Sequence, residues 1–276
     1  MNVRAYAKVN LTLDIISARD DGFHSIRSVM VPVSLFDRVS VERAERISFD
    51  CDLPALRNED NLCIRAAKAF FEAAGIRGGA DIRLQKHIPF PAGLGGASAD
   101  AAAVIDCLST IYGAPLDFDE LIRVAAEVGS DVPFCLYGKP ALCEGRGEII
   151  TPIAGDMELF IVIAIGAGRL STGEVYAAYD RASLAPTDHT TGFLEALSNG
   201  ADICRHMGNS FVPVVSALCP ETADMRDSLL KCGAGAAMLS GSGPAVYGVF
   251  ENELSAANAA KVLRAEGYFS VECRTM

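Results

Sequence analysis

The sequence predicts an α+β fold in two domains, and three observations support this. Strand-like and helix-like segments are mixed along the chain without the regular alternation of a doubly wound parallel sheet. No segment repeats at a fixed period. The length of 276 residues suits one large domain or two moderate ones, since domains usually hold about 100–200 residues. The pattern changes near residues 150–157, so we expect domains at 1–153 and 154–276.

In the first half, the clearest element is a strand at residues 5–16. Apolar and polar residues alternate there, which predicts one buried face. A helix is expected at 60–74, with Asp60 as its N-cap and Gly75 just past its end. The remaining elements expected in this half are a turn at 19–22, strands at 29–35, 38–41 and 80–84, and helices at 99–112 and 118–128.

The second half has the same mixture of elements. A helix stopped by Gly233 is a typical case, because glycine favours the backbone conformation that ends helices. The turn-rich stretch 185–200 predicts no definite element. The elements expected here are strands at 159–165, 236–240, 245–250 and 268–274, and helices at 174–182, 223–231 and 256–264.

Composition and charge narrow the class of protein. Half of the residues are hydrophobic and 21% are charged, which argues against disorder. The 24 basic and 35 acidic residues give a net charge of −11, unfavourable for non-specific binding of nucleic acid or anionic membranes. No apolar run is long enough to span a bilayer, and no secretory signal is visible at the N-terminus. We therefore expect a cytoplasmic protein with a small-molecule substrate and neither nucleic acid nor membrane as a partner.

The cysteines and histidines show no pattern of a metal site or a disulfide framework. The nine cysteines are an odd number and none forms C-x-x-C, while the four histidines do not form H-E-x-x-H. Reduced thiols, as in the cytosol, are the simplest interpretation. The sequence assigns no metal ligands.

The most informative segment is Pro91-Ala-Gly-Leu-Gly-Gly-Ala-Ser98, a glycine-rich loop that leads into a helix. Glycines allow the backbone to approach a ligand closely, and a helix N-terminus presents unpaired N–H groups and a positive dipole end. Together these features form a phosphate cradle. The alternative is an ordinary turn capped by Ser98. The loop is neither a Walker A motif, which needs a following Gly-Lys-Ser/Thr, nor a dinucleotide fingerprint, which needs glycine at position 98.

Four segments together resemble the GHMP kinases, which bind ATP phosphates with such a loop in place of a Walker loop. The segments are Ala5-Tyr-Ala-Lys-Val-Asn-Leu-Thr-Leu13, Arg19-Asp-Asp-Gly-Phe-His24, Pro91-Ala-Gly-Leu-Gly-Gly-Ala-Ser-Ala-Asp100 and Leu239-Ser-Gly-Ser-Gly-Pro-Ala245. The Asp-Gly-Phe-His turn and Gly129-Ser-Asp-Val-Pro133 are most similar to GHMP kinases of the non-mevalonate isoprenoid (terpenoid precursor) pathway. Those enzymes phosphorylate a cytidine diphosphate-linked methylerythritol.

The resemblance implies a fold, a reaction and a nucleotide-binding loop. The N-terminal domain would resemble domain 2 of ribosomal protein S5, and the C-terminal domain would be ferredoxin-like. The γ-phosphoryl group of ATP would move to the substrate's 2-hydroxyl group, with Mg²⁺ held mainly by phosphates and water. The ATP-binding residues would be Pro89, Phe90, Pro91, Ala92, Gly93, Leu94, Gly95, Gly96, Ala97, Ser98 and Ala99.

Two residues match the family's catalytic positions. Lys8 would be the catalytic lysine, since a cation near the transferred phosphoryl group stabilises its charge. Without the resemblance, a solvated lysine on a sheet is the simpler interpretation. Asp131 would be the general base for the attacking hydroxyl group, although an aspartate that bonds its own turn is common at such positions. Asn10 would orient the substrate, or it would only satisfy a backbone group.

The Asp-Gly-Phe-His turn would form the cytosine site. The resemblance implies that Phe23 stacks on the base and that His24 donates a hydrogen bond to it. Tyr176 would cover the other face of the base, with a core tyrosine as the equal alternative. Phe23 would otherwise pack into the core of the first hairpin. The Gly241-Ser-Gly-Pro244 segment would lie against the first glycine loop, or it would only form a tight turn.

The sequence departs from the family at three positions. Ala97 and Ala99 replace a glycine and a serine of the usual loop, which leaves Ser98 as the hydroxyl group available to a phosphate or metal. Phe23 replaces a tyrosine and loses its phenol.

Two other functions fit the superfamily. The first is a GHMP kinase of the mevalonate or homoserine type, which the Phe23-His24 turn disfavours because neither substrate has a base. The second is an inactive sensor with this fold, which an intact Lys8 and Asp131 disfavour.

Overall fold

The computed structural model describes residues 1–155 and 157–276. The chain forms two compact units, each assembled from separate stretches of sequence. Unit 1 comprises Met1–Ala7, Leu35–Pro89 and Gly95–Lys139, and unit 2 comprises Lys8–Ser34, Phe90–Leu94 and Pro140–Met276. The expected boundary between residues 153 and 154 stays a prediction. No helix in the described ranges is long and apolar enough to cross a membrane.

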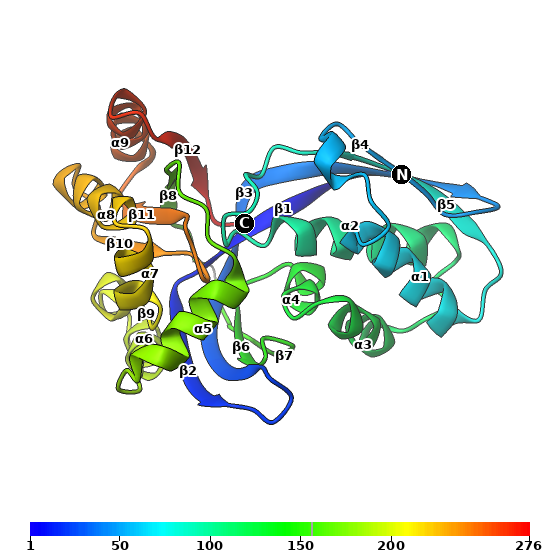
Figure 1. Ribbon diagram of the computed structural model, residues 1–276, viewed down its shortest axis with the longest axis horizontal. Helices are drawn as coiled ribbons and strands as arrows, with labels where there is room; N and C mark the ends of the chain where they lie inside the picture. The colour runs from blue at the N-terminus through cyan, green and yellow to red at the C-terminus, as the bar shows by residue number, and fades with distance from the viewer. Residues whose placement is uncertain (156) are drawn as a thin grey trace. The chain divides into compact units, whose positions relative to one another are not determined.

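Unit 1 is a layer of strands with helices packed on one side, as the right half of Figure 1 shows. The strand order is β4–β5–β3, and β1 also pairs with β3. Phe70, Ile82 and Leu108 are fully buried where the helices meet the strands. The elements are β1 (Asn2–Asn10) and β3 (His24–Ala44), which both continue into unit 2, β4 (Ser48–Cys51), η1 (Pro54–Leu56), α1 (Leu62–Ala74), β5 (Gly79–Gln85), α2 (Gly96–Ile111), α3 (Phe118–Val128) and α4 (Val132–Tyr137).

The second sheet of unit 2 confirms the ferredoxin-like expectation. It is antiparallel in the order β10–β11–β8–β12, so its strands follow the 4-1-3-2 order of a β-α-β-β-α-β fold. Helices α8 and α9 pack on it (Figure 1). Its elements are β8 (Phe160–Ile165), α8 (Glu221–Lys231), β10 (Ala236–Leu239), β11 (Val246–Phe250), α9 (Glu253–Ala265) and β12 (Phe269–Arg274).

In the rest of unit 2, strand β2 lies beside a strand from the segment that follows β8. Strand β2 pairs with β3 on one side and with the short strand β9 on the other. The elements are β2 (Thr12–Ala18), β6 (Ala141–Gly145), β7 (Ile149–Pro152), α5 (Thr172–Ala182), α6 (His189–Ser198), η2 (Ile203–His206), β9 (Gly208–Asn209) and α7 (Val212–Leu218).

The structure corrects the expected strands of the first half. The strand expected at 5–16 is two strands, β1 and β2, separated at Leu11, and most of its polar face is buried as well, namely Lys8, Asn10, Thr12 and Asp14. The expected break at 36–37 does not occur, and β3 runs through it. Asp37 is fully buried there and accepts backbone hydrogen bonds from His87 and Ile88, so it needs no turn to satisfy it.

The helices follow the sequence more closely than the strands do. Helix α3 has the expected bounds because Asp117 and Glu120 form a capping box. The expected cap of α1 was wrong, since Asn61, not Asp60, accepts the amide hydrogen bond of Cys63. Gly75 ends α1 as expected, in the left-handed conformation with φ of 63°. The unassigned stretch 185–200 contains α6, which is capped by the side chain of Asp188.

Candidate active site

The glycine loop needs glycine at two positions. Gly93 and Gly95 have φ angles of 78° and 68°, a region that other residues rarely adopt. A Cβ atom on Gly93 would also lie 2.2 Å from the carbonyl oxygen of Ser240. Any side chain at position 93 would therefore displace the loop.

Helix α2 begins directly after this loop and has a bare N-terminus. Gly95 occupies its N-cap position, no side chain caps the helix, and its first turn contains no acidic residue. The first amides of a helix have no partner within it, so they and the positive end of the dipole suit a phosphate group. Ser98 lies inside the first turn, so the alternative of a turn capped by Ser98 was wrong.

The second glycine segment lies against the first, as expected. The hydroxyl group of Ser240 donates to the carbonyl oxygen of Gly93 at 2.9 Å, and the amide of Ala245 donates to Ala92 at 3.1 Å. Gly241 has a φ of 57°, and a Cβ atom there would lie 3.1 Å from the carbonyl oxygen of Gly93. The two turns therefore brace each other within unit 2.

Lys8 lies next to both turns. Its backbone amide donates to the carbonyl oxygen of Leu94 in the glycine loop at 2.9 Å. Its ammonium nitrogen is 3.4 Å from the point where a Cβ atom of Gly241 would stand. The side chain is buried, with only 3% of Lys8 exposed, so the alternative of a solvated sheet lysine was wrong. Burying an ammonium group is costly unless it is hydrogen-bonded, which predicts built-in partners.

Asn10 is one of those partners. The Nζ atom of Lys8 donates to Oδ1 of Asn10 at 2.7 Å, and Asn10 is itself buried. The hydroxyl group of Tyr247, on β11, donates to the backbone carbonyl oxygen of Asn10 at 2.8 Å. The side-chain amide thus bonds to a catalytic candidate, so the alternative that Asn10 only satisfies a backbone group was wrong.

Asp131 stands at the N-terminus of α4 in unit 1. It occupies the N-cap position, but its side chain does not cap the helix. Asp131 is partly exposed, and α4 packs against α2, the helix that follows the glycine loop. It therefore differs from an ordinary turn aspartate whose carboxylate bonds its own helix.

The Asp-Gly-Phe-His turn projects Phe23 to the surface. Gly22 has a φ of 81°, and the Phe23 side chain that follows it is 48% exposed. The guanidinium group of Arg146 lies 5.0 Å from the centre of its ring. The alternative that Phe23 packs into a core was therefore wrong.

His24 is buried and is held by helix α5. Its Nε2 atom is 2.7 Å from Oδ1 of Asp180, and its ring centre is 4.8 Å from that of Tyr176. Tyr176 and Asp180 are four residues apart on α5, so they share one face of the helix. The structure thus brings Tyr176 to His24, and Tyr176 is only partly buried. Asp180 was missed by the sequence analysis, although this spacing from Tyr176 could have indicated it.

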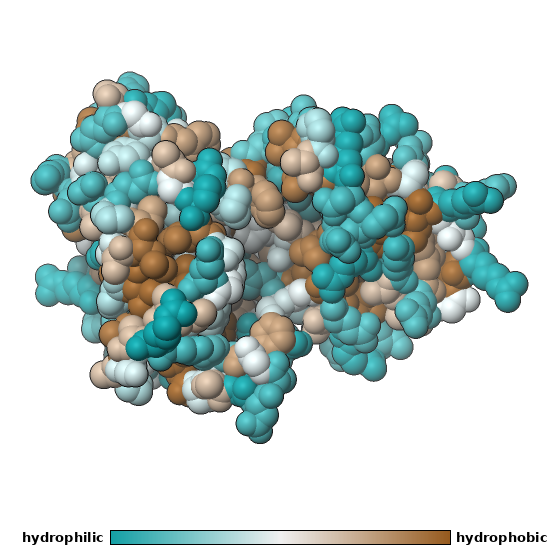
Figure 2. Space-filling view, viewed as in Figure 1, coloured by the Kyte–Doolittle hydropathy of each residue, from teal (hydrophilic) through white to brown (hydrophobic). Residues whose placement is uncertain are grey.

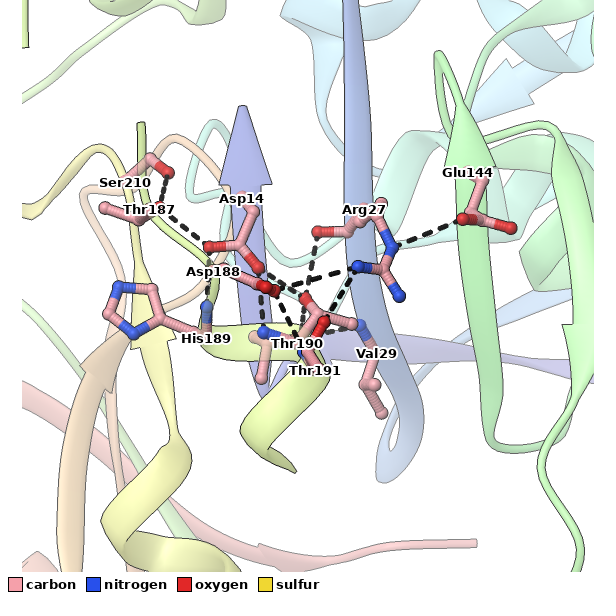
Figure 3. Close-up of polar contacts among 11 residues, drawn as sticks. Asp14, Arg27, Val29, Glu144, Thr187, Asp188, His189, Thr190, Thr191 and Ser210 are labelled. Atoms are coloured by element: carbon pink, nitrogen blue, oxygen red, sulfur yellow. Dashed lines mark hydrogen bonds and ion pairs between the residues drawn. The ribbon is translucent and has the colours of Figure 1, made fainter. Parts of the chain in front are cut away.

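A second missed cluster surrounds Asp14 in unit 2. Figure 3 shows its buried carboxylate receiving hydrogen bonds from the segment that starts α6. Burial alone would raise the pKa of Asp14, but hydrogen bonds from Thr190, His189 and Thr187 lower it below the usual value. Asp14 is therefore an ionised anchor that ties α6 to β2.

The third missed cluster is in unit 1, next to the start of α2. Lys86 Nζ bridges Asp37 and Asp100, with 2.8 Å to Oδ2 of Asp100. The other oxygen of Asp100 is buried without a hydrogen-bond partner among the described residues. Burial raises the pKa of Asp100 to about 7, against the opposing effect of Lys86. A Cβ atom on Gly96 would lie 3.3 Å from Lys86 Nζ, so this cluster supports the first turn of α2.

A cavity of about 370 Å³ lies in unit 2, and none of the residues expected in the site lines it. Figure 2 shows hydrophobic side chains at the surface over α7, whose Val212 and Pro213 are part of the lining. Thr187, Ser210 and Arg226 add polar groups.

Comparison with known proteins first gives the class. The family model for the N-terminal domain of GHMP kinases matches residues 61–139, and the model for their C-terminal domain matches residues 193–268. Solved structures below 25% identity show the same fold. A homoserine kinase from Cytophaga hutchinsonii has a TM-score of 0.76 at 21% identity, covering 100% of this chain and 94% of that one. The α+β GHMP kinase fold is confirmed.

More similar relatives give the family within that class. A 4-diphosphocytidyl-2-C-methyl-D-erythritol kinase from Symbiobacterium thermophilum is 44% identical over 254 residues, which are 90% of each chain. One from Caldanaerobacter subterraneus is 40% identical, covering 91% of this chain and 88% of the relative. A crystal structure of a 4-(cytidine 5'-diphospho)-2C-methyl-D-erythritol kinase has a TM-score of 0.84 at 35% identity, covering 100% of this chain and 99% of that one. This chain belongs to the 4-diphosphocytidyl-2-C-methyl-D-erythritol kinase family.

This membership confirms that the chain is an enzyme, a phosphotransferase with an alcohol acceptor. It favours the isoprenoid-pathway kinase over the mevalonate and homoserine types and over the inactive sensor. The roles of the individual site residues stay predictions.

Proposed function

We propose that this chain transfers the γ-phosphoryl group of ATP to the 2-hydroxyl group of 4-diphosphocytidyl-2-C-methyl-D-erythritol. The hydroxyl oxygen attacks the γ-phosphorus, the bond to the β-phosphate oxygen breaks, and ADP leaves. The observation that carries the proposal is the buried Lys8, whose backbone bonds to the glycine loop and whose ammonium group lies beside the Gly241 turn.

Lys8 and the glycine loop would share the charge of the transferred group. Phosphoryl transfer depends mainly on positioning and on stabilising charge at the equatorial oxygens. The ammonium group of Lys8 supplies such charge, and the bare N-terminus of α2 supplies amides for the other phosphates of ATP. Ala97 and Ala99 leave backbone amides and the Ser98 hydroxyl group for this task.

Asp131 would accept the proton of the 2-hydroxyl group. Its carboxylate stands at the N-cap position of α4 without capping the helix, and a positioned general base contributes about 10²–10⁴-fold to a rate.

The cytosine ring would be bound at the Asp-Gly-Phe-His turn. Phe23 offers an exposed aromatic face, and the ring nitrogen of His24 that does not face Asp180 is the candidate hydrogen-bond partner of the base. The donor role expected for His24 requires a proton on both ring nitrogens, because Nε2 already faces the Asp180 carboxylate. Asp180 and Tyr176 hold the His24 ring, so Tyr176 supports the site through His24 as well as by any contact of its own.

Mg²⁺ would enter with ATP. Within the described ranges, no three histidine, cysteine, aspartate or glutamate side chains are grouped so that they could hold a metal. Magnesium is commonly bound through phosphates, waters and one or two carboxylates, so this chain fits a metal carried by the nucleotide. When bound, it would neutralise phosphate charge. We also infer a cytoplasmic enzyme, in line with an odd number of scattered cysteines that suits reduced thiols.

A coupled ADP-release assay tests the function. The purified chain with ATP and Mg²⁺ receives 4-diphosphocytidyl-2-C-methyl-D-erythritol, mevalonate or homoserine, and we expect turnover with the first alone. The matched variant Asp131→Asn should retain ATP binding and lose about 10²–10⁴-fold in kcat. Turnover with mevalonate or homoserine would contradict the substrate, and ATP binding with no turnover of any of the three would contradict the kinase.

A further inference from the structure

A line of hydrogen bonds continues from Lys8 past Asn10. The Nδ2 atom of Asn10 donates to the hydroxyl oxygen of Ser28 at 2.8 Å, and that hydroxyl group donates to the backbone carbonyl oxygen of Thr12 at 2.6 Å. All four residues are buried, and Ser28 and Thr12 are fully so. They lie on three strands of unit 2, with Ser28 on β3 facing the junction of β1 and β2.

Proton accounting fixes the direction of this line. A carbonyl oxygen can only accept, so the single hydroxyl proton of Ser28 is committed to Thr12. The Ser28 oxygen can then only accept from Asn10, which places the NH₂ end of the amide at Ser28 and its oxygen at Lys8. A flipped amide would set NH₂ against the ammonium group and leave two oxygens facing each other without a proton.

We propose that Ser28 is a positioning residue for Lys8, acting through the side-chain amide of Asn10. It holds Asn10 in the one orientation that accepts a hydrogen bond from the Lys8 ammonium group. The proposal deepens the proposed function, since it rests on Lys8 being the catalytic lysine of this kinase.

The far end of the line is rigid. The hydroxyl groups of Thr12 and Thr190 are 2.8 Å apart, and Thr190 donates to the carboxylate of Asp14 at 2.6 Å. Thr12 also accepts the amide hydrogen bond of Val29, the residue after Ser28. Figure 3 shows this end, where Asp14 collects bonds from the start of α6. Ser28 is therefore held between strands that are themselves tied together, and it cannot follow a shift of Asn10.

The consequence for catalysis is one of distance. A displacement of about 1 Å in a group that stabilises the transition state costs up to about 100-fold in rate. If the Asn10 amide is free to rotate, the Lys8 ammonium group loses a fixed acceptor in a site that admits little water. The loss should fall on kcat, because the charge that Lys8 stabilises is greatest in the transition state.

The test uses three variants of the full chain. Ser28→Ala removes the hydroxyl group, and Ser28→Thr keeps it. Ser270→Ala is the matched control, because Ser270 is also a buried serine of unit 2 whose hydroxyl group donates to a backbone carbonyl oxygen, that of Ala260. Ser270 lies on β12 and contributes nothing to the line from Lys8.

Steady-state rates and melting temperatures give the first readout. For Ser28→Ala we expect kcat to fall about 10- to 100-fold, with the KM for ATP within about twofold of wild type. Ser28→Thr should stay within about threefold in kcat. Ser270→Ala should lower the melting temperature by about as much as Ser28→Ala does, but it should leave kcat unchanged. An unchanged kcat in Ser28→Ala, equal kcat losses in Ser28→Ala and Ser270→Ala, or a Ser28→Thr protein as slow as Ser28→Ala would overturn the proposal.

A second readout does not depend on activity. The side-chain amide protons of Asn10, observed by ¹⁵N NMR without substrate, should exchange with water at least about tenfold faster in Ser28→Ala than in wild type or Ser270→Ala. If the wild type fails to phosphorylate its expected substrate, the proposed function is wrong. The exchange experiment still measures whether Ser28 holds the Asn10 amide. If the Asn10 amide protons exchange no faster in Ser28→Ala than in wild type, the proposed role of Ser28 is overturned even in an active enzyme.

Discussion

Among the residues that the structure describes, each unit buries one lysine side chain, and the two lysines are bound in different ways. Lys86 of unit 1 lies between two carboxylates, Asp37 and Asp100. Lys8 of unit 2 donates to a neutral amide oxygen, and that amide is held by a serine. Only 3% of the Lys86 side chain and 3% of the whole Lys8 residue are exposed, so burial of the side chain alone does not distinguish the two lysines.

The different partners of the two lysines suit different roles. In the Lys86 cluster, charges compensate one another and the backbone is satisfied, as the bonds from His87 and Ile88 to Asp37 show. Such a cluster fixes the chain that enters the glycine loop. The line from Lys8 consists of neutral groups, those of Asn10 and Ser28, which orient the ammonium group. An oriented positive charge is what a phosphoryl transfer requires.

The sharpest way to test this contrast is Lys8→Met, which keeps the stem and removes the charge. We expect kcat to fall about 10³- to 10⁵-fold, the range found when a cation that stabilises phosphoryl transfer is removed. Leaving the Asn10 oxygen unbonded should cost about 1–3 kcal/mol of stability. Steady-state kinetics and thermal melts measure both. A variant that only raises the KM for ATP would make Lys8 a ground-state phosphate contact.

Lys86→Met should have the opposite profile. Removing one partner of a buried ionic cluster costs about 3–5 kcal/mol, because it leaves the other charges uncompensated. We expect this loss in the free energy of unfolding, measured by urea denaturation. The kcat of the fraction that remains folded should fall far less than in Lys8→Met. A protein of normal stability would show that the cluster does not hold the fold.

Most of the features that could be predicted from the sequence depend on residues that are close together in the chain. The bounds of α3 are confirmed because they depend on neighbouring residues. The glycine loop and Lys8 were singled out by their resemblance to a family, and their roles stay predictions. Ser28, Asp180 and Asp37 were missed because their partners lie 18, 156 and 49 residues away in the chain. Sequence periodicity also suggested a solvated polar face on the first strand. That face is buried because β2 pairs with β3 and β9 and α6 packs on it.

Phe23→Ala tests the cytosine site and extends the comparison to an exposed group. Because Phe23 is 48% exposed, its truncation should leave the melting temperature nearly unchanged. Loss of stacking should weaken the cytidylyl substrate by about 1–3 kcal/mol, roughly ten- to hundredfold in KM, with ATP unaffected. Phe118→Ala is the matched control, since Phe118 is 50% exposed and lies on α3. Equal KM values in the two variants would remove Phe23 from the cytosine site.

The smallest expected effect is a change in how stability depends on pH, and Asp100→Asn reveals it. Asp37 accepts three hydrogen bonds, whereas Asp100 keeps one oxygen without a partner, so Asp100 is the carboxyl group that holds a proton in the Lys86 cluster. Its pKa is raised from 3.8 to about 7 by burial, so the folded protein retains a proton that the unfolded chain has released. This contribution to stability is fully present below pH 3.8 and is lost progressively as the pH rises from there through about 7.

Asn cannot titrate, so the variant should gain about 1 kcal/mol relative to wild type between pH 6 and pH 8. Urea denaturation of both proteins at several pH values measures this difference. Asp37→Asn is the control, because it removes the acceptor of the His87 and Ile88 amides and should destabilise the protein at every pH. Parallel pH profiles for Asp100→Asn and wild type would show that the proton is held elsewhere. The cluster would then carry both carboxylates ionised, and the charge balance around Lys86 would have to be revised.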